Sequence, residues 1–79
     1  MVTVRYWAGA RAAAGLSEEQ VDAGTVGDLL AAIGTRPPLA KVLGGSSLLV
    51  DGSAVRRDDT AHPLPGGSVV DVLPPFAGG

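Results

Sequence analysis

Cysteine is absent from this sequence of 79 residues, and histidine occurs only once, as His62. Without cysteine the chain can form no disulfide, no thiolate zinc site and no cysteine nucleophile. A single histidine in a polar segment beside a proline is more often a surface residue than a ligand or a general base, and no Ser-His-Asp set can be assembled around it. Because most side chains used in catalysis are missing, we expect a protein that is not an enzyme and that binds neither a metal nor a cofactor.

Large basic clusters and long apolar runs are missing as well. Six Lys and Arg residues against eight Asp and Glu residues give a net charge of −2, and the pair Arg56-Arg57 is the largest basic group. Such a chain offers little to the phosphates of a nucleic acid. No apolar stretch approaches the roughly 20 residues that cross a membrane, and the first residues lack the pattern of a signal peptide. We therefore expect a soluble, cytoplasmic protein with neither nucleic acid nor membrane as a partner.

Aromatic residues are scarce, with one Phe, one Trp and one Tyr, so Val, Leu and Ala have to fill the core. The sequence is 46% hydrophobic and 18% charged, which is typical of a folded globular domain and not of a disordered chain. A chain of this length forms a single domain. We assign residues 1–73 to that domain and residues 74–79 to a flexible C-terminal tail.

Hydrophobic periodicity predicts an α+β fold. Alternating residues 2–7 indicate a first strand, and Thr25 is a good N-cap for a helix that stops at Gly34. Weaker patterns predict a turn of helix at 8–14, an edge strand within 16–23, a short helix at 39–43 after an Arg36-Pro37-Pro38 connector, paired strands at 48–50 and 54–55, and a last strand at 68–73. This order suits a mixed sheet that wraps one main helix, the ubiquitin-like β-grasp arrangement, whose first and last strands lie parallel at the sheet centre.

The two faces of the predicted sheet differ in composition. One face should pack on the helix stripe of Val26, Leu29, Leu30 and Ile33, and it consists of Val2, Val4, Tyr6, Val70 and Val72. The other face carries Thr3, Arg5, Trp7, Val69, Asp71 and Leu73. Trp7 and Leu73 lie at the end from which the tail leaves, so they are either covered by a loop or by sheet twist, or they form a docking patch. On the edge strand we expect Glu18, Glu19 and Asp22 to face water.

The last predicted strand runs straight into six further residues, Pro74, Pro75, Phe76, Ala77, Gly78 and Gly79. The two prolines stop the strand and make a stiff spacer, and six extended residues reach about 20 Å. Glycine has no side chain, so the end of the tail can enter a channel too narrow for other residues and present a terminal carboxylate there. The alternative is a frayed chain end without a function.

Three segments resemble the MoaD/ThiS family of sulfur carriers: residues 4–11 (VRYWAGAR), 25–30 (TVGDLL) and, above all, 73–79 (LPPFAGG). The resemblance covers essentially the whole chain. The Pro-Pro-x-x-Gly-Gly ending is most similar to the branch that forms the small subunit of molybdopterin synthase. The resemblance implies the β-grasp fold and a protein that carries sulfur as a C-terminal thiocarboxylate.

In that family an ATP-dependent activating enzyme adenylates the terminal carboxylate, and the resemblance assigns this reaction to Gly79. Sulfur delivery then releases AMP and leaves a thiocarboxylate, while Gly78 permits close approach. The tail of a molybdopterin synthase small subunit enters the large subunit and donates sulfur to cyclic pyranopterin monophosphate. The resemblance therefore implies two protein partners, an adenylating enzyme of the ubiquitin-activation type, which uses ATP, and the large subunit. The partner-binding residues that we predict are Trp7, Leu73, Pro74, Pro75, Phe76 and Ala77.

Other functions remain compatible with the sequence. Sulfur carriers for thiazole or cysteine biosynthesis share the fold and the Gly-Gly ending. A ubiquitin-like modifier would join Gly79 to a lysine amine of another protein, and a plain β-grasp interaction module would not use its tail at all.

Overall fold

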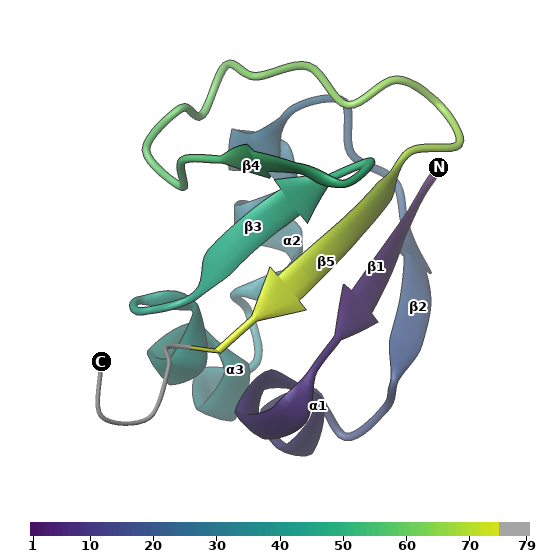
Figure 1. Cartoon of the computed structure of the whole chain (residues 1–79). Helices are drawn as coiled ribbons and strands as arrows, with labels where there is room; N and C mark the ends of the chain where they lie inside the picture. The colour runs from purple at the N-terminus through teal and green to yellow at the C-terminus, as the bar shows by residue number, and fades with distance from the viewer. Residues whose placement is uncertain (75–79) are drawn as a thin grey trace.

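The computed structural model describes residues 1–74, in which three helices pack on a five-stranded mixed sheet (Figure 1). In chain order the elements are β1 (Val2–Tyr6), α1 (Ala8–Ala14), β2 (Glu18–Val21), α2 (Val26–Ile33), α3 (Pro37–Leu43), β3 (Ser47–Val50), β4 (Ser53–Val55) and β5 (Val69–Leu73). The strand order is β2-β1-β5-β3-β4. The α+β class and the mixed sheet that we predicted are confirmed.

The centre of the sheet is formed by the two strands that are farthest apart in the sequence. β1 and β5 run parallel, with Tyr6 opposite Val72, whereas the other neighbouring strands are antiparallel. The predicted apolar face is buried: Val2, Val4, Tyr6, Val70 and Val72 are each at most 2% exposed. These side chains share one core with α2 and α3, so the alternation in the sequence identified the inner face correctly.

The helix α2 begins and ends where local chemistry requires it. The Thr25 hydroxyl accepts a hydrogen bond from the backbone N–H of Asp28 at 3.1 Å, as the predicted N-cap should. At the other end, a Cβ on Gly34 would lie 2.6 Å from the Leu30 carbonyl oxygen, so only glycine fits without a shift of the backbone. With eight residues, α2 is only one residue longer than each of the other two helices, and α3 adds Leu39 to the core.

The two prolines that we predicted to be a connector belong to a helix instead. Pro37 and Pro38 occupy the first turn of α3, which continues to Leu43. The first N–H groups of a helix have no partner within the helix, so proline loses no hydrogen bond there, and its fixed φ favours the helical conformation. The pair therefore starts the helix that the pattern placed two residues later.

The predicted hairpin of the second half is confirmed. β3 and β4 pair through the turn at Asp51 and Gly52, whose φ angles of 49° and 87° are both positive. Positive φ at both central residues is typical of the two-residue turns that match the twist of a hairpin. The Asp51 carboxylate also accepts a hydrogen bond from the backbone N–H of Val69, at 2.9 Å, and so ties this turn to the start of β5.

β2 is an edge strand, as predicted, but the expectation that Glu19 faces water is wrong. Glu19 lies opposite Val4 on β1, which turns its side chain toward the inner side of the sheet. There it accepts hydrogen bonds from the Tyr6 hydroxyl and from Arg36, just before α3. Burial alone would raise the pKa of Glu19, but these two hydrogen bonds and the Arg36 charge lower it overall. Glu18 and Asp22 are exposed, as expected.

Candidate functional site

The end of β5 brings the described part of the predicted tail against the start of α1. The backbone N–H of Trp7 donates to the Val72 carbonyl at 3.2 Å, which holds the C-terminal ends of β1 and β5 together. A Cβ built on Gly9 would lie 3.9 Å from the Cβ of Pro74, so Pro74 passes close to the first turn of α1. Residues from the two ends of the chain therefore meet where the tail begins. The predicted site residues Pro75, Phe76, Ala77, Gly78 and Gly79 lie outside the described residues.

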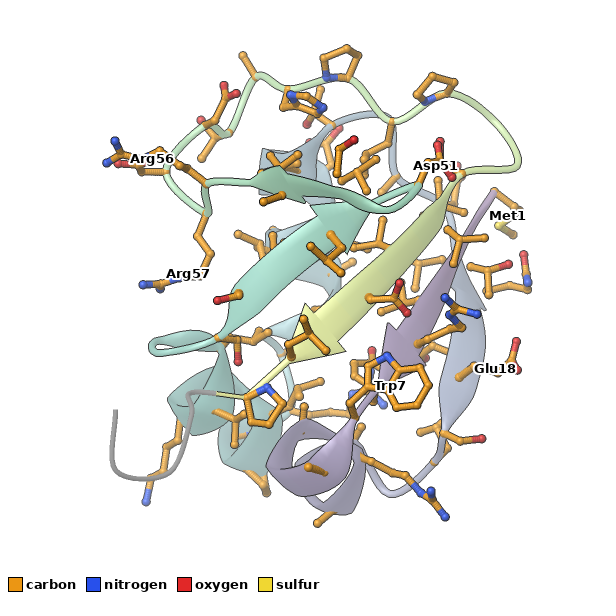
Figure 2. The ribbon with its side chains drawn as sticks, in the orientation of Figure 1. Met1, Trp7, Glu18, Asp51, Arg56 and Arg57 are labelled. Atoms are coloured by element: carbon orange, nitrogen blue, oxygen red, sulfur yellow. The ribbon has the colours of Figure 1, made fainter. Side chains whose placement is uncertain are left out.

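Trp7 is exposed on the sheet face turned away from the helices. Its side chain lies in front of the lower end of β1 (Figure 2), and 47% of the residue is accessible. Within residues 1–74 the only other large hydrophobic residue exposed to this degree is Met1. Leu73 is half-buried on the neighbouring strand. Of the two alternatives for Trp7, coverage by a loop is therefore ruled out within the described part of the chain, and its role in docking stays a prediction.

The register of the strands defines the outer surface of the sheet, which we call the open face. Its central members are Thr3, Arg5, Trp7, Ser47, Leu49, Val69, Asp71 and Leu73. The surface is a mixture of aliphatic residues, one indole and one ion pair. Aromatic and arginine side chains are enriched at protein interfaces.

An acidic residue that sequence reasoning left without a role lies in the middle of the open face. Asp71 is only 7% exposed and accepts hydrogen bonds from Arg5 and from the indole N–H of Trp7. The hydrogen bonds from Arg5 are the main reason that the pKa of Asp71 lies below its ordinary value; burial opposes the shift, and the Trp7 bond supports it. The alternation of residues in the sequence predicted that Arg5, Trp7 and Asp71 share this face. Their contact depends on side-chain geometry, which the sequence pattern does not show.

The single histidine is engaged in a local contact. His62 Nδ1 lies 3.4 Å from the Asp59 carboxylate, and the His62 carbonyl accepts a hydrogen bond from the backbone N–H of Val26. Among residues 1–74, no three His, Asp or Glu side chains come close enough together to hold a metal ion. None of the helices in that range is both long and apolar enough to cross a membrane.

The basic pair lies at the opposite edge of the molecule from Trp7 (Figure 2). Arg56 forms an exposed ion pair with Asp58, and Arg57 donates to the Leu43 carbonyl at 3.1 Å. Both arginines line an open groove of about 590 Å³ beside β4, together with Leu30, Leu48 and Val55. None of the predicted site residues that the structure describes lines this groove, so we place the candidate site on the open face and at the start of the tail.

A parallel pair of terminal strands at the centre of a five-stranded sheet, with the chain leaving from the end of the last strand, defines a small ubiquitin-like β-grasp protein. The chain matches the family described as ThiS over residues 4–79 and belongs to that family. The matched range includes the tail residues that carry the predicted chemistry. Small carrier proteins of the ThiS type are generally not enzymes themselves.

Solved structures of small proteins are similar to this chain over nearly its whole length. The chain is similar to the small archaeal modifier protein 1 of Methanosarcina acetivorans, with 26% identity, coverage of 99% of this chain and 95% of that one, and a TM-score of 0.84. It is 32% identical to a candidate molybdopterin-converting factor subunit 1 from Pyrococcus furiosus, with 95% and 97% coverage and a TM-score of 0.70. A chain in the complex of subunits 1 and 2 of the molybdopterin-converting factor of Helicobacter pylori, at 23% identity, 99% and 97% coverage and a TM-score of 0.78, shares the fold. No curated protein matched the sequence significantly.

Proposed function

We propose that this protein is the sulfur carrier of molybdopterin synthesis, the small subunit of a molybdopterin synthase. The observation that carries the proposal is the match to the ThiS family through residue 79, together with a last strand that leads into Pro74 beside Gly9, two residues after the exposed Trp7. The 32% identity to a candidate molybdopterin-converting factor subunit supports this branch of the family.

The chemistry takes place at Gly79. A carboxylate is a poor electrophile, so an ATP-dependent adenylating enzyme first converts it to an acyl adenylate and releases pyrophosphate. Sulfide supplied by the sulfur donor then attacks the carbonyl carbon: the C–S bond forms as the C–O bond to AMP breaks, and the products are the thiocarboxylate and AMP. Gly78 allows both enzymes to approach the terminal carbon closely because it has no side chain. The carrier itself supplies no catalytic group and binds no cofactor.

The domain provides binding energy and the tail provides reach. Six extended residues after Leu73 span about 20 Å, enough to place the terminal group inside the active site of a large subunit. Pro74, Pro75, Phe76 and Ala77 form the arm. Trp7 and Leu73 on the open face contact the partner next to the point at which the arm leaves. Binding through the domain then fixes the position of the thiocarboxylate for transfer to cyclic pyranopterin monophosphate.

The intact mass of the protein tests the carrier chemistry. Incubation with ATP, a sulfur source and the adenylating enzyme of the same organism should produce the mass change of one oxygen atom replaced by sulfur. A chain without Gly79 is the control and should show no change. An unchanged mass of the full chain, with an enzyme that is active on its own carrier, would overturn the proposal.

A ubiquitin-like modifier is the second candidate, because a protein that is 26% identical over nearly the whole chain is described as a modifier. Both candidates require adenylation of Gly79, but only a modifier remains attached to lysine amines of other proteins. Detection of this chain in cell extracts separates them: a carrier runs as one species, and a modifier gives a ladder of heavier ones. Carriers for thiazole or cysteine synthesis would pass the mass test but fail to support molybdopterin formation with the large subunit.

A further inference from the structure

We propose that Asp71 is a positioning residue: with Arg5, it holds the indole of Trp7 in one orientation on the open face, ready to meet the partner protein. The inference rests on the proposed docking role of this face and adds the residues that prepare it. It gives a function to a buried carboxylate that the sulfur chemistry does not use.

Both oxygens of the Asp71 carboxylate are occupied. Arg5 Nε donates to Oδ1 at 2.7 Å and Arg5 Nη2 donates to Oδ2 at 3.0 Å, which is the two-pronged geometry that makes arginine–carboxylate pairs strong. Trp7 Nε1 donates to the same Oδ1 at 2.9 Å. The Arg5 guanidinium also lies over the indole, with 5.8 Å between its carbon and the ring centroid. The three side chains therefore form one connected unit, which we call the Trp7 clamp.

The strand register builds this unit. Arg5 on β1 lies directly opposite Asp71 on β5, and Trp7 follows two residues after Arg5 on the same face. Arg5 also lies opposite Glu18 on β2, so it has a carboxylate on either side. Arg5 forms its ion pair with the buried Asp71 and not with the exposed Glu18. This ion pair places the Arg5 guanidinium beside the indole.

The clamp matters because the indole is exposed. An unrestrained tryptophan on a surface samples several rotamers, and a partner that binds one of them has to overcome the lost freedom. The indole has a single hydrogen-bond donor, so one bond from Nε1 is enough to fix the rotation of the ring. With Nε1 directed at Asp71, the polar edge of the ring is satisfied within the domain, and the apolar surface that Arg5 does not cover is left for the partner. Rigid aromatic anchors of this kind carry much of the energy of many interfaces.

Tryptophan fluorescence reports directly on the Trp7 clamp, because Trp7 is the only tryptophan in the sequence. We would compare the wild type with Asp71→Asn, which keeps the shape of the side chain but removes the charge that holds Arg5. The matched control is Asp58→Asn, which breaks the exposed Arg56–Asp58 pair at the other edge of the molecule. Time-resolved fluorescence anisotropy should show faster local rotation of the indole in Asp71→Asn and no change in Asp58→Asn.

Affinity is measured with the purified large subunit of molybdopterin synthase as the probe, on samples shown to be folded by circular dichroism. We expect about fivefold to tenfold weaker binding for Asp71→Asn, the size of the net effect of one ordinary hydrogen bond, and unchanged binding for Asp58→Asn. In a Trp7→Phe background, which has no N–H to hold, Asp71→Asn should weaken binding by less than about twofold because the pair acts through the same contact. Should Asp71→Asn not fold, Arg5→Lys, which keeps the charge without the two-pronged geometry, replaces it in both measurements.

The outcomes separate this inference from the function on which it rests. Weaker binding of Trp7→Ala with full binding of Asp71→Asn would show that the indole docks without a clamp and would overturn the positioning role. Unchanged binding of Trp7→Ala would overturn the docking face itself, and the clamp with it, while the mass test at Gly79 would still stand. Equal indole rotation in the wild type and Asp71→Asn would also overturn the clamp.

Discussion

At the scale of single residues, two carboxylates of this domain, Glu19 and Asp71, connect separate elements through their hydrogen bonds. On the inner side Glu19 receives hydrogen bonds from Tyr6 and Arg36 and so links β1, β2 and the start of α3. On the open face Asp71 is held by Arg5 across β1 and β5. Both carboxylates have a pKa below the ordinary value, because hydrogen bonds from charged or hydroxyl donors favour the ionised form.

The Glu19 contact predicts a dependence of stability on pH. Its pKa in the folded protein lies below the ordinary value of 4.5, so its contribution is complete above that pH and is lost as the pH falls through the lowered folded-state value. Glu19→Gln should reduce the free energy of unfolding at pH 7 by about 1 kcal/mol, and the difference from the wild type should shrink toward pH 3. Urea denaturation at both pH values measures this.

Glu18→Gln is the matched control for that experiment, because Glu18 is the exposed neighbour on the same strand. Its substitution should change the free energy of unfolding by less than about 0.5 kcal/mol at either pH. An equal loss of stability for the two variants would contradict the role that we assign to the contact of Glu19 with Tyr6 and Arg36.

At the scale of elements, local contacts determine where the helices end, and their buried apolar side chains determine how they pack. The stop of α2 is the clearest case, because Gly34 sits against the backbone of the preceding turn. Gly34→Ala should lower the free energy of unfolding by about 1–2 kcal/mol, since a backbone oxygen cannot move aside as a flexible side chain can. Thermal or urea unfolding followed by circular dichroism gives the value.

A glycine in open space is the control for Gly34. Gly24 precedes α2, has no atom within 4 Å of its ideal Cβ position and has no positive φ. Gly24→Ala should therefore be neutral or stabilise the protein by up to about 1 kcal/mol, because alanine restricts the unfolded chain. If both alanine variants lost the same stability, the close approach at Gly34 would not be what ends the helix.

The elements also show which parts of the fold could be predicted from the sequence alone. Period-two alternation predicted β1 and β5 and their inner face, because a buried strand in a small sheet requires it. The start of α3 was missed, since a Pro-Pro pair is equally compatible with a connector and with a first helical turn. The contacts of Glu19 and Asp71 were missed as well, because they join residues 13 to 66 positions apart through side-chain rotamers that no periodicity records.

At the scale of the whole molecule, the described core ends before the residues that we predict to be the tail. Every buried hydrophobic residue described lies between Val2 and Val72. A chain that ends after Pro74 should therefore unfold within about 0.5 kcal/mol of the full chain, yet it should not be adenylated. A chain that ends after Asp71 loses Val72 from the core and should be destabilised by several times that amount, about 2–4 kcal/mol. A large loss of stability in the longer truncation would show that the tail supports the domain.

The central position of β5 has a consequence for the timing of folding. β5 fills the gap between β1 and β3, so on a ribosome neither neighbour can complete its pairing before residues 69–73 have left the exit tunnel. The domain therefore folds only after nearly all of it has been synthesised, with contacts of long sequence separation formed last. The glycines that follow β5 in the sequence leave the exit tunnel after the residues that close the sheet. Under the proposed function, an adenylating enzyme that binds the open face would therefore meet Gly79 on a domain that has folded.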